Sequence, residues 1–454
     1  MKTATTLFLL FAAAGCFTAA SAKGYDAGVA KLEITPKQNM WMSGYGARTK
    51  PSTGTLQPLW VKSLAIRDDR RNTFVIVTTD LVGLPKEITD AISARVQKEY
   101  NISRANLLFN ASHTHTGPFV KANLSTLFSF APEEQRQVDE YAQTLADTMF
   151  NAIGASLARM EAADLTFGTG TAGFAVNRRQ KMADGTVKIG VNPEGPIDHS
   201  VPVLKVVSKR SSKTLAILTG YACHNTTLTG EFYEFSGDYA GFAQSEIEAA
   251  NPGAVALFLI LCGADQNPNP RSSVALARQH GKSLADAVQK VLDENRMKPV
   301  EGHITAALEM AKLNFAMHTR ETFEKELTSK IPAQVRRARL MLAKYDERAP
   351  VRTILYPVQA VSFGKSLTFL TLAGEVVIDY SIRAKREFPK VNLVVVGYSN
   401  DMPGYIPSKR VLHEGGYEAV DSMIYYGQPG PFSDDVEELI FAAVRRVMKR
   451  VSAN

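Results

Sequence analysis

Three histidines and one glutamate in this chain each stand directly or shortly after a short apolar run. They are His113, His115, His224 and Glu375, and the preceding runs are 106–110, 214–222 and 367–372. Imidazole nitrogens and carboxylate oxygens are donors that zinc takes at ~2.0–2.2 Å, and a catalytic zinc keeps one position for water. Zinc lowers the pKa of that water to ~7, which makes a hydroxide nucleophile at neutral pH. These residue types therefore indicate a hydrolytic metal site.

The spacing of His113 and His115 leaves their roles open. On a strand both rings would face one side, whereas in a turn they could diverge, so one of them suffices as a ligand and the other is free for proton transfer. Each histidine also has an ordinary interpretation as a hydrogen-bonded buried side chain. Glu375 likewise has an ordinary interpretation, as a carboxylate in the first turn of a helix.

The apolar runs alternate with amphipathic segments from about residue 60 onward. Strands are expected over 64–66, 73–79, 106–110, 214–222, 254–261, 360–363, 367–372 and 392–396. Helices are expected over 85–100, 132–160, 272–295, 376–388 and 433–451. This order predicts an α/β fold with a largely buried mixed sheet flanked by helices. Ligands of such sheets bind beside the carboxyl ends of the strands, where the polar clusters stand.

Composition and the first residues restrict the class of protein. With 45% apolar and 21% charged residues the chain is an ordinary globular protein, and its net charge of +7 is spread too evenly for nucleic-acid binding. Residues 1–22 resemble a signal peptide, which predicts export to the periplasm or the medium, with a lipid anchor at Cys16 as the alternative. No later run is long enough to span a membrane. We expect one domain over 23–454, with a helical insertion over 315–349.

Several motifs together resemble the catalytic domain of the neutral ceramidase family, zinc-dependent hydrolases that cleave the amide of ceramide. The most specific is the run His113-Thr114-His115-Thr116-Gly117-Pro118. The others, in chain order, are 30–36, 43–45, Asn177-Arg178, His224, 236–239, Gly374-Glu375, 400–405 and 417–419. They extend over nearly all of the expected mature chain.

The resemblance implies a role for each matching residue. His113, His224, Glu375 and Tyr405 match the zinc ligands, the last as a phenolate. His115 matches a second catalytic histidine. Tyr417 matches a tyrosine that polarises the scissile carbonyl, and Arg178 an arginine near the amide. Tyr405 and Tyr417 also have an ordinary interpretation as packed aromatic residues.

The chain departs from the family at a position to which a direct catalytic role has been assigned. A serine is expected after the strand that ends at Cys262, but residues 262–268 contain none. A mechanism that depends on serine is therefore unsupported, and zinc-bound water remains as the nucleophile. We also expect the catalytic domain without the family's C-terminal immunoglobulin-like domain.

Three functions remain open on these grounds. The first is a zinc amidohydrolase of an N-acyl sphingoid lipid, which would need an apolar groove and transient contact with a membrane surface. Phe119, Leu124, Leu127 and Phe128 are candidates for that groove or for the core. The second is a zinc hydrolase of another amide or ester. The third is a secreted binding protein without catalysis. The oligomeric state and the pairing of Cys223 with Cys262 are left open.

Overall fold

The computed structural model describes residues 24–294 and 296–452, so the expected signal peptide and Cys16 lie outside the described residues. Its largest sheet has nine strands in the order β12-β10-β9-β6-β1-β3-β4-β5, with β14 beside β6. The bounds are β1 (Tyr25–Glu33), β3 (Trp60–Arg67), β4 (Thr73–Thr79), β5 (Leu107–Ala111), β6 (Glu161–Thr171), β9 (Ser200–Ser208), β10 (Thr214–Tyr221), β12 (Val255–Ile260) and β14 (Lys298–Pro299). The pairs β4·β5 and β10·β12 are parallel and the others antiparallel. The sheet is therefore mixed, as predicted.

A second sheet covers one face of the first. It consists of β15 (Ile304–Asn314), β16 (Thr353–Phe363), β17 (Leu367–Leu372) and β19 (Leu393–Val396), in that order. Phe74 of β4 packs against Phe363 and Phe369 of the second sheet, with ring centroids 6.1 and 6.3 Å apart. The two sheets thus share one apolar layer, which the sequence did not reveal because a strand covered by a sheet is as apolar as one covered by a helix.

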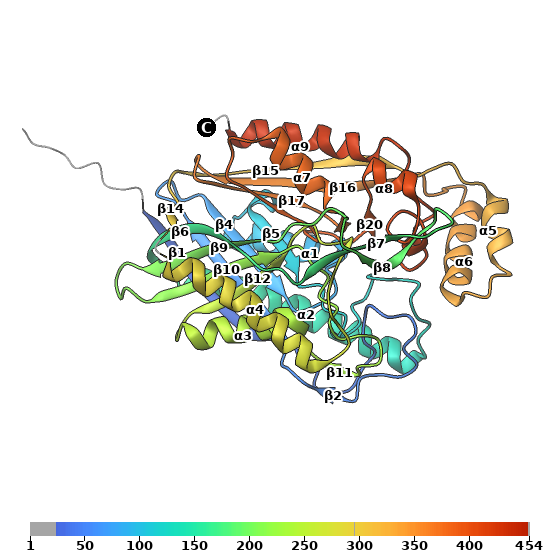
Figure 1. Ribbon diagram of the computed structural model, residues 1–454, viewed down its shortest axis with the longest axis horizontal. Coiled ribbons are helices and arrows are strands. Elements are labelled where there is room, and N and C mark those ends of the chain that lie inside the picture. Colours follow the sequence, from blue (N-terminus) through green and yellow to red (C-terminus); the bar gives the residue numbers. More distant parts are fainter. Residues whose placement is uncertain (1–23, 295, 453–454) are drawn as a thin grey trace, which may run out of the picture.

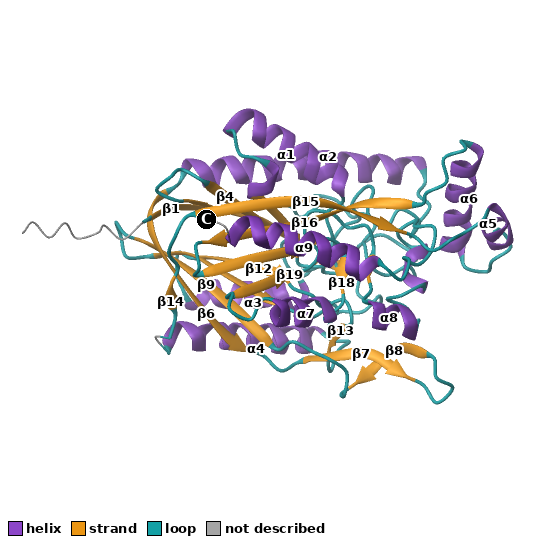
Figure 2. Ribbon diagram, turned by 90° about the horizontal axis from the view of Figure 1, so that it is seen from above, coloured by secondary structure: helices purple, strands orange, loops and turns teal. Residues whose placement is uncertain are grey.

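Helices cover the two outer faces, so the layers run helix, sheet, sheet, helix (Figures 1 and 2). On the side of the large sheet lie α1 (Lys86–Tyr100), α2 (Pro132–Ala158), α3 (Asp238–Ala250) and α4 (Val274–Asp293). On the side of the small sheet lie α7 (Asp379–Glu387) and α9 (Val436–Ser452). In α9 the buried residues Ile440, Val444, Val447 and Val451 recur at helical spacing, and they form the face that packs on β15 and β16. This agrees with the predicted flanking helices.

Shorter elements surround one end of the sandwich. Helices α5 (Arg320–Glu326) and α6 (Pro332–Asp346) lie within the predicted insertion and pack against each other at the edge of the molecule (Figure 1). The remaining elements are β2 (Gly54–Thr55), β7 (Ala175–Lys181), β8 (Val187–Asn192), β11 (Glu234–Phe235), β13 (Gln266–Pro268), β18 (Glu375–Val376), β20 (Tyr405–Ile406), α8 (Lys409–Glu414) and the 3-10 helices Arg104–Asn106 and Asp421–Ile424. Among the described residues, none of the helices has the length and apolar character needed to cross a membrane.

The carboxyl ends of strands from both sheets meet at this end. Isolated bridges join Asn110 of β5 to Ser399, and Leu261 to Val396 of β19. The Asn110 amide also donates to the carbonyl oxygen of Gly397 at 2.9 Å. The segments that follow β5, β10, β12 and β17 are therefore held close together, although they are far apart in sequence.

Candidate metal centre

His113 is fixed by the turn that follows β5. Its backbone is left-handed, with φ of 61°, and this turns the side chain back toward the carboxyl end of the strand. The Nδ1–H donates to the carbonyl oxygen of Val82 at 2.6 Å. Because a carbonyl only accepts, this bond leaves Nε2 as the atom that a neutral ring offers to a cation.

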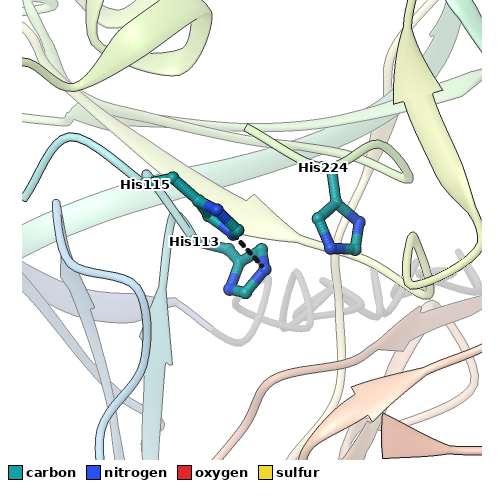
Figure 3. A group of neighbouring side chains, drawn as sticks. All are labelled: His113, His115 and His224. Atoms are coloured by element: carbon teal, nitrogen blue, oxygen red, sulfur yellow. Dashed lines mark hydrogen bonds between the residues drawn. The ribbon is translucent and has the colours of Figure 1, made fainter. Parts of the chain in front are cut away.

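His224 stands three residues beyond β10 and is held in the same way. Its Nδ1–H donates to the carbonyl oxygen of Gly263 at 2.9 Å. Burial, together with the positive charge of Arg178, lowers the pKa of His224 to about 3. The ring is therefore neutral at pH 7, and its Nε2 carries a lone pair. Figure 3 shows His224 beside His113 and His115, on a separate segment of the chain.

Glu375 and Tyr405 are partners in the parallel pair β18·β20. The pairing needs glycine at position 374, where φ is 69° and a Cβ would lie 2.5 Å from the carbonyl oxygen of Gly404. The Oε2 of Glu375 lies 3.2 Å from Nε2 of His113 and 3.0 Å from Nε2 of His224. The Tyr405 hydroxyl lies 3.1 Å from the same His224 nitrogen. The structure thus brings together all four predicted ligands.

The arrangement of these atoms fits a bound cation. Ligands ~2.1 Å from a tetrahedral zinc lie ~3.4 Å from one another, close to the separations found here. The Oε2 of Glu375 is buried and receives no hydrogen bond, which is costly for a carboxylate without a cation. The nitrogen and oxygen donors suit zinc, and by themselves they suit other divalent metals too.

His115 supplies a third nitrogen to the same cluster. Its Nε2 lies 3.0 Å from Nε2 of His113, and one ring nitrogen from each of the three histidines lies within 4.8 Å of the other two (Figure 3). Its ring packs edge-on against Tyr45, with 4.8 Å between centroids, and its Nδ1 has no hydrogen-bond partner. Burial, with the nearby His113 and His224, lowers the pKa of His115 well below its ordinary value. His115 therefore stands beside the metal position as a neutral imidazole.

Arg178 of β7 connects the cluster to a buried ion pair. Its Nη2 donates to the Tyr405 hydroxyl at 2.9 Å, and its Nε donates to Glu418 at 2.7 Å. Glu418 also accepts from Nη1 of Arg179 at 2.6 Å. Burial raises the pKa of Tyr405 well above its ordinary value, and Arg178 opposes that rise by favouring the phenolate.

A pocket of about 420 Å³ opens onto these residues. Tyr417 lines it, with its ring centroid 5.4 Å from that of Tyr405 and 5.7 Å from the guanidinium carbon of Arg178. Of the four apolar candidates for a groove, Leu124 and Leu127 line the pocket. Phe119 and Phe128 instead form an aromatic cluster 6.0 Å apart between centroids.

Several residues of the site were not identified from the sequence. Tyr426 donates a short hydrogen bond to Oε1 of Glu375, and Glu418 holds Arg178. Asn267 lines the pocket from β13, in the segment where serine was expected. The available signal was position, because Glu418 directly follows Tyr417 and Asn267 lies in the polar segment that follows the predicted strand 254–261. Cys223 and Cys262 are buried thiols.

Comparison with known proteins identifies relatives of the chain. It is 23% identical over 255 residues to the neutral ceramidase of Mycobacterium tuberculosis, across 50% of this chain and 38% of that protein. The alignment therefore spans well under half of the relative. The crystal structure of neutral ceramidase from Pseudomonas aeruginosa superposes with a TM-score of 0.71 at 17% identity, over 95% of this chain and 74% of that one. The structure of a ceramidase complexed with C2 superposes with a TM-score of 0.72 at 16% identity, over 95% of this chain and 75% of that one.

The structural likeness concerns the fold alone, since identity is low. The family model for the N-terminal region of neutral/alkaline non-lysosomal ceramidases matches residues 25–269, more than half of the chain. The matched segment contains His113, His115 and His224. On this basis the chain belongs to the neutral/alkaline non-lysosomal ceramidase family.

Proposed function

We propose that this protein is an exported zinc-dependent amidohydrolase that cleaves the amide bond of an N-acyl sphingoid lipid of the ceramide type. The observation that carries the proposal is the buried oxygen of Glu375, which faces His113 and His224 with no hydrogen-bond donor. It lies at the wall of a pocket in a chain of the ceramidase family. The relatives described above are neutral ceramidases, which supports amide hydrolysis as the reaction.

His113, His224, Glu375 and Tyr405 are the residues that would hold the metal. When bound, zinc supplies a Lewis acid for the scissile carbonyl and lowers the pKa of a water molecule to ~7. The chain fixes its two imidazole donors through the carbonyl oxygens of Val82 and Gly263, so that little reorganisation is needed on binding.

Other residues of the pocket move or stabilise charge. His115 is kept neutral by its burial and stands beside the metal position, so it takes a proton from the attacking water and returns it to the leaving amine. Tyr417 lines the pocket and donates its hydroxyl hydrogen to the carbonyl oxygen as negative charge develops there. Arg178 holds the hydroxyl of Tyr405 in place.

The residues of the pocket wall favour particular kinds of substrate. Leu124 and Leu127 offer apolar surface for an acyl chain. Asn267 and Thr226 line another part of the wall, with their side-chain oxygens 3.5 Å apart. These polar groups favour a second candidate, a zinc hydrolase of the same fold that acts on a more polar amide or ester.

The test combines metal content by elemental analysis with hydrolysis of a fluorescent N-acyl sphingosine. We expect wild type to hold one zinc per chain and to release the fatty acid. His224→Ala should lose both properties because a ligand and a buried donor are removed. His413→Ala is the matched control, since this histidine is exposed and pairs with Asp434 at the surface.

The outcomes separate the candidates. Zinc without hydrolysis of the sphingolipid would redirect the search to other amides and esters. Wild-type protein purified without any metal, and unable to bind zinc on titration, would contradict the catalytic proposal and leave a binding protein. Export rests on residues 1–22, and N-terminal sequencing of exported protein should begin at Lys23.

A further inference from the structure

Arg271 presents a positive charge to the pocket. In the sequence it is not a neighbour of any of the proposed metal ligands. It lies in the loop between β13 and α4, is partly buried, and lines the pocket together with Tyr45. Its Nη2 donates to the Tyr45 hydroxyl at 3.1 Å, and that hydroxyl donates in turn to the carbonyl oxygen of Leu228 at 3.1 Å. The Arg271 side chain is thus fixed at the pocket wall.

The charge of Arg271 has no carboxylate partner in the described part of the chain. Among residues 24–294 and 296–452, no Asp or Glu oxygen lies within 4.0 Å of its guanidinium nitrogens, in contrast to Arg178 and Arg179, which share Glu418. Asp238 is near enough for Arg271 to lower its pKa, but burial dominates and raises that pKa to about 6. The oxygens of Asp238 are occupied by the backbone N–H groups of Leu228 and Tyr239.

A second guanidinium strengthens the positive potential on this side. Arg48 lies over the ring of Tyr45, 5.1 Å from its centroid, and donates to the carbonyl oxygens of Ser43 and Phe232. It too has no carboxylate within 4.0 Å in the described part of the chain. Burial lowers the pKa of Arg48 to about 10, so it remains charged at pH 7. Tyr45 is therefore placed between two cations.

The hydrogen bond to Tyr45 does not by itself explain why an arginine stands at position 271. A guanidinium carries five N–H donors, and the hydrogen bond to Tyr45 uses one of them. Over the described residues no other hydrogen bond of the Arg271 side chain is found, while the group stands at a pocket wall. Planar guanidinium groups with free donors are the residues that proteins use to bind carboxylate, phosphate and similar anions.

We propose that Arg271 binds an anionic group of the substrate, so that the enzyme acts on N-acyl compounds that carry a carboxylate or a phosphate in addition to the scissile amide. The proposal rests on the proposed amidohydrolase function and adds to it a preference for substrates with an anionic group. Arg271 acts here in binding and specificity, whereas the residues that would hold the metal, together with His115 and Tyr417, serve the cleavage. The apolar wall at Leu124 and Leu127 is expected to take the acyl chain.

Two matched pairs of substrates test the proposal and distinguish its sources of charge. The first pair is N-dodecanoylglycine and N-dodecanoylethanolamine, and the second is ceramide 1-phosphate and ceramide. We expect wild-type zinc enzyme to favour the anionic member of at least one pair by about 10- to 100-fold in kcat/KM, the usual effect of a hydrogen bond to a charged group. If only the first pair shows this preference, the group that Arg271 binds is a carboxylate. If only the second pair shows it, the group is a phosphate.

Variants assign the preference to Arg271. Arg271→Gln should abolish the preference by lowering kcat/KM for the anionic member far more than for the neutral one, whereas Arg271→Lys should keep part of it because the charge remains. Arg386→Gln is the matched control, since it removes the same charge from an exposed position of α7. Thermal unfolding should show that all three variants fold. Wild type without preference, or a preference unchanged in Arg271→Gln, would overturn the proposal.

A binding measurement keeps this test independent of catalysis. Calorimetric titration of chelator-treated protein with N-dodecanoylglycine and with ceramide 1-phosphate in mixed micelles should show binding of at least one anion. Arg271→Gln should weaken it by about 10-fold or more. If zinc enzyme cleaves none of the four compounds but the titration shows this loss, the amidohydrolase proposal fails and the anion site stands. Equal affinities of wild type and Arg271→Gln, or no binding of either anion, would refute the anion site.

Discussion

Two buried glutamates stand on either side of Arg178 and Tyr405, and they are satisfied in opposite ways. Both oxygens of Glu418 accept from guanidinium groups, Oε1 from Arg178 and Oε2 from Arg179. Glu375 accepts from Tyr426 on Oε1, while its Oε2 faces the imidazoles of His113 and His224 without a donor.

The difference separates a positioning group from a candidate ligand. Burial acts to raise the pKa of Glu418, but the two arginines outweigh it and lower that pKa, so the charge is balanced within the chain. At Glu375 the carboxylate oxygen and the atoms around it are instead arranged in a way that suits a bound cation. Burial alone does not distinguish the two residues, since their exposed fractions are 1% and 2%. The identity of the neighbouring atoms distinguishes the two glutamates.

The largest expected effect is on stability and comes from the balanced glutamate. Glu418→Gln leaves Arg178 and Arg179 buried beside a neutral amide, so we expect the free energy of unfolding to fall by about 3–5 kcal/mol. Urea denaturation of the zinc-loaded protein measures it. Glu414→Gln is the control, because this residue pairs with Arg179 at 3.0 Å but its side chain is 36% exposed, so its removal should cost less than about 1 kcal/mol. Equal losses in the two variants would remove the distinction.

A smaller effect is expected on metal binding at the other glutamate. Tyr426→Phe removes the hydroxyl that donates to Oε1 of Glu375 and leaves the carboxylate less well oriented. Loss of such a supporting hydrogen bond usually costs about 10- to 100-fold in metal affinity. Competition with a zinc chelator at fixed pH measures the change. Tyr425→Phe provides a neighbouring control that lines the pocket without contacting Glu375 through its hydroxyl. An unchanged zinc affinity in Tyr426→Phe would contradict the supporting role.

The sequence predicted the candidate ligands better than it predicted their supports. His113, His224, Glu375 and Tyr405 were identified because each lies in a motif of the family, and the structure brings them together. Glu418 stands in the 417–419 motif but acts on a residue 240 positions away, and Tyr426 acts on a residue 51 positions away, so the local pattern gives neither of them its role. The identity of such partners depends on which strand ends meet, which is a property of the tertiary fold.

The same limit applies to the fold. Helices such as α2 and α9 were expected because their apolar residues recur at helical spacing. Strand β6 was not expected. Its buried positions alternate with exposed ones such as Asp164, as in a half-buried strand, but its several Ala and Gly residues disfavour a strand and leave no apolar run. The second sheet was missed as a separate layer because its strands β16 and β17 are as apolar as strands covered by helices.

Asp265 extends the comparison to a third buried carboxylate, which has no cationic side chain beside it among the described residues. Its oxygens accept from the backbone N–H of Ile378 at 2.9 Å and from the Asn177 amide at 3.2 Å. In the described chain no Lys, Arg or His nitrogen lies within 4.0 Å of it. Burial therefore raises the pKa of Asp265 from 3.8 to about 7.

This raised pKa predicts a dependence of the free energy of unfolding on pH. Between pH 4 and 7 the folded protein holds a proton on Asp265 that the unfolded chain has released, so rising pH destabilises the fold. Asp265→Asn removes this contribution. We expect wild type to lose about 1.4 kcal/mol per pH unit relative to the variant across that window, on top of a constant difference from the altered hydrogen bonds. Urea denaturation of both proteins from pH 4.5 to 7 measures the slope. If the two curves run parallel, Asp265 is ionised in the fold throughout this range, and hydrogen bonds from Ile378 and Asn177 suffice to hold a buried charge without a cation.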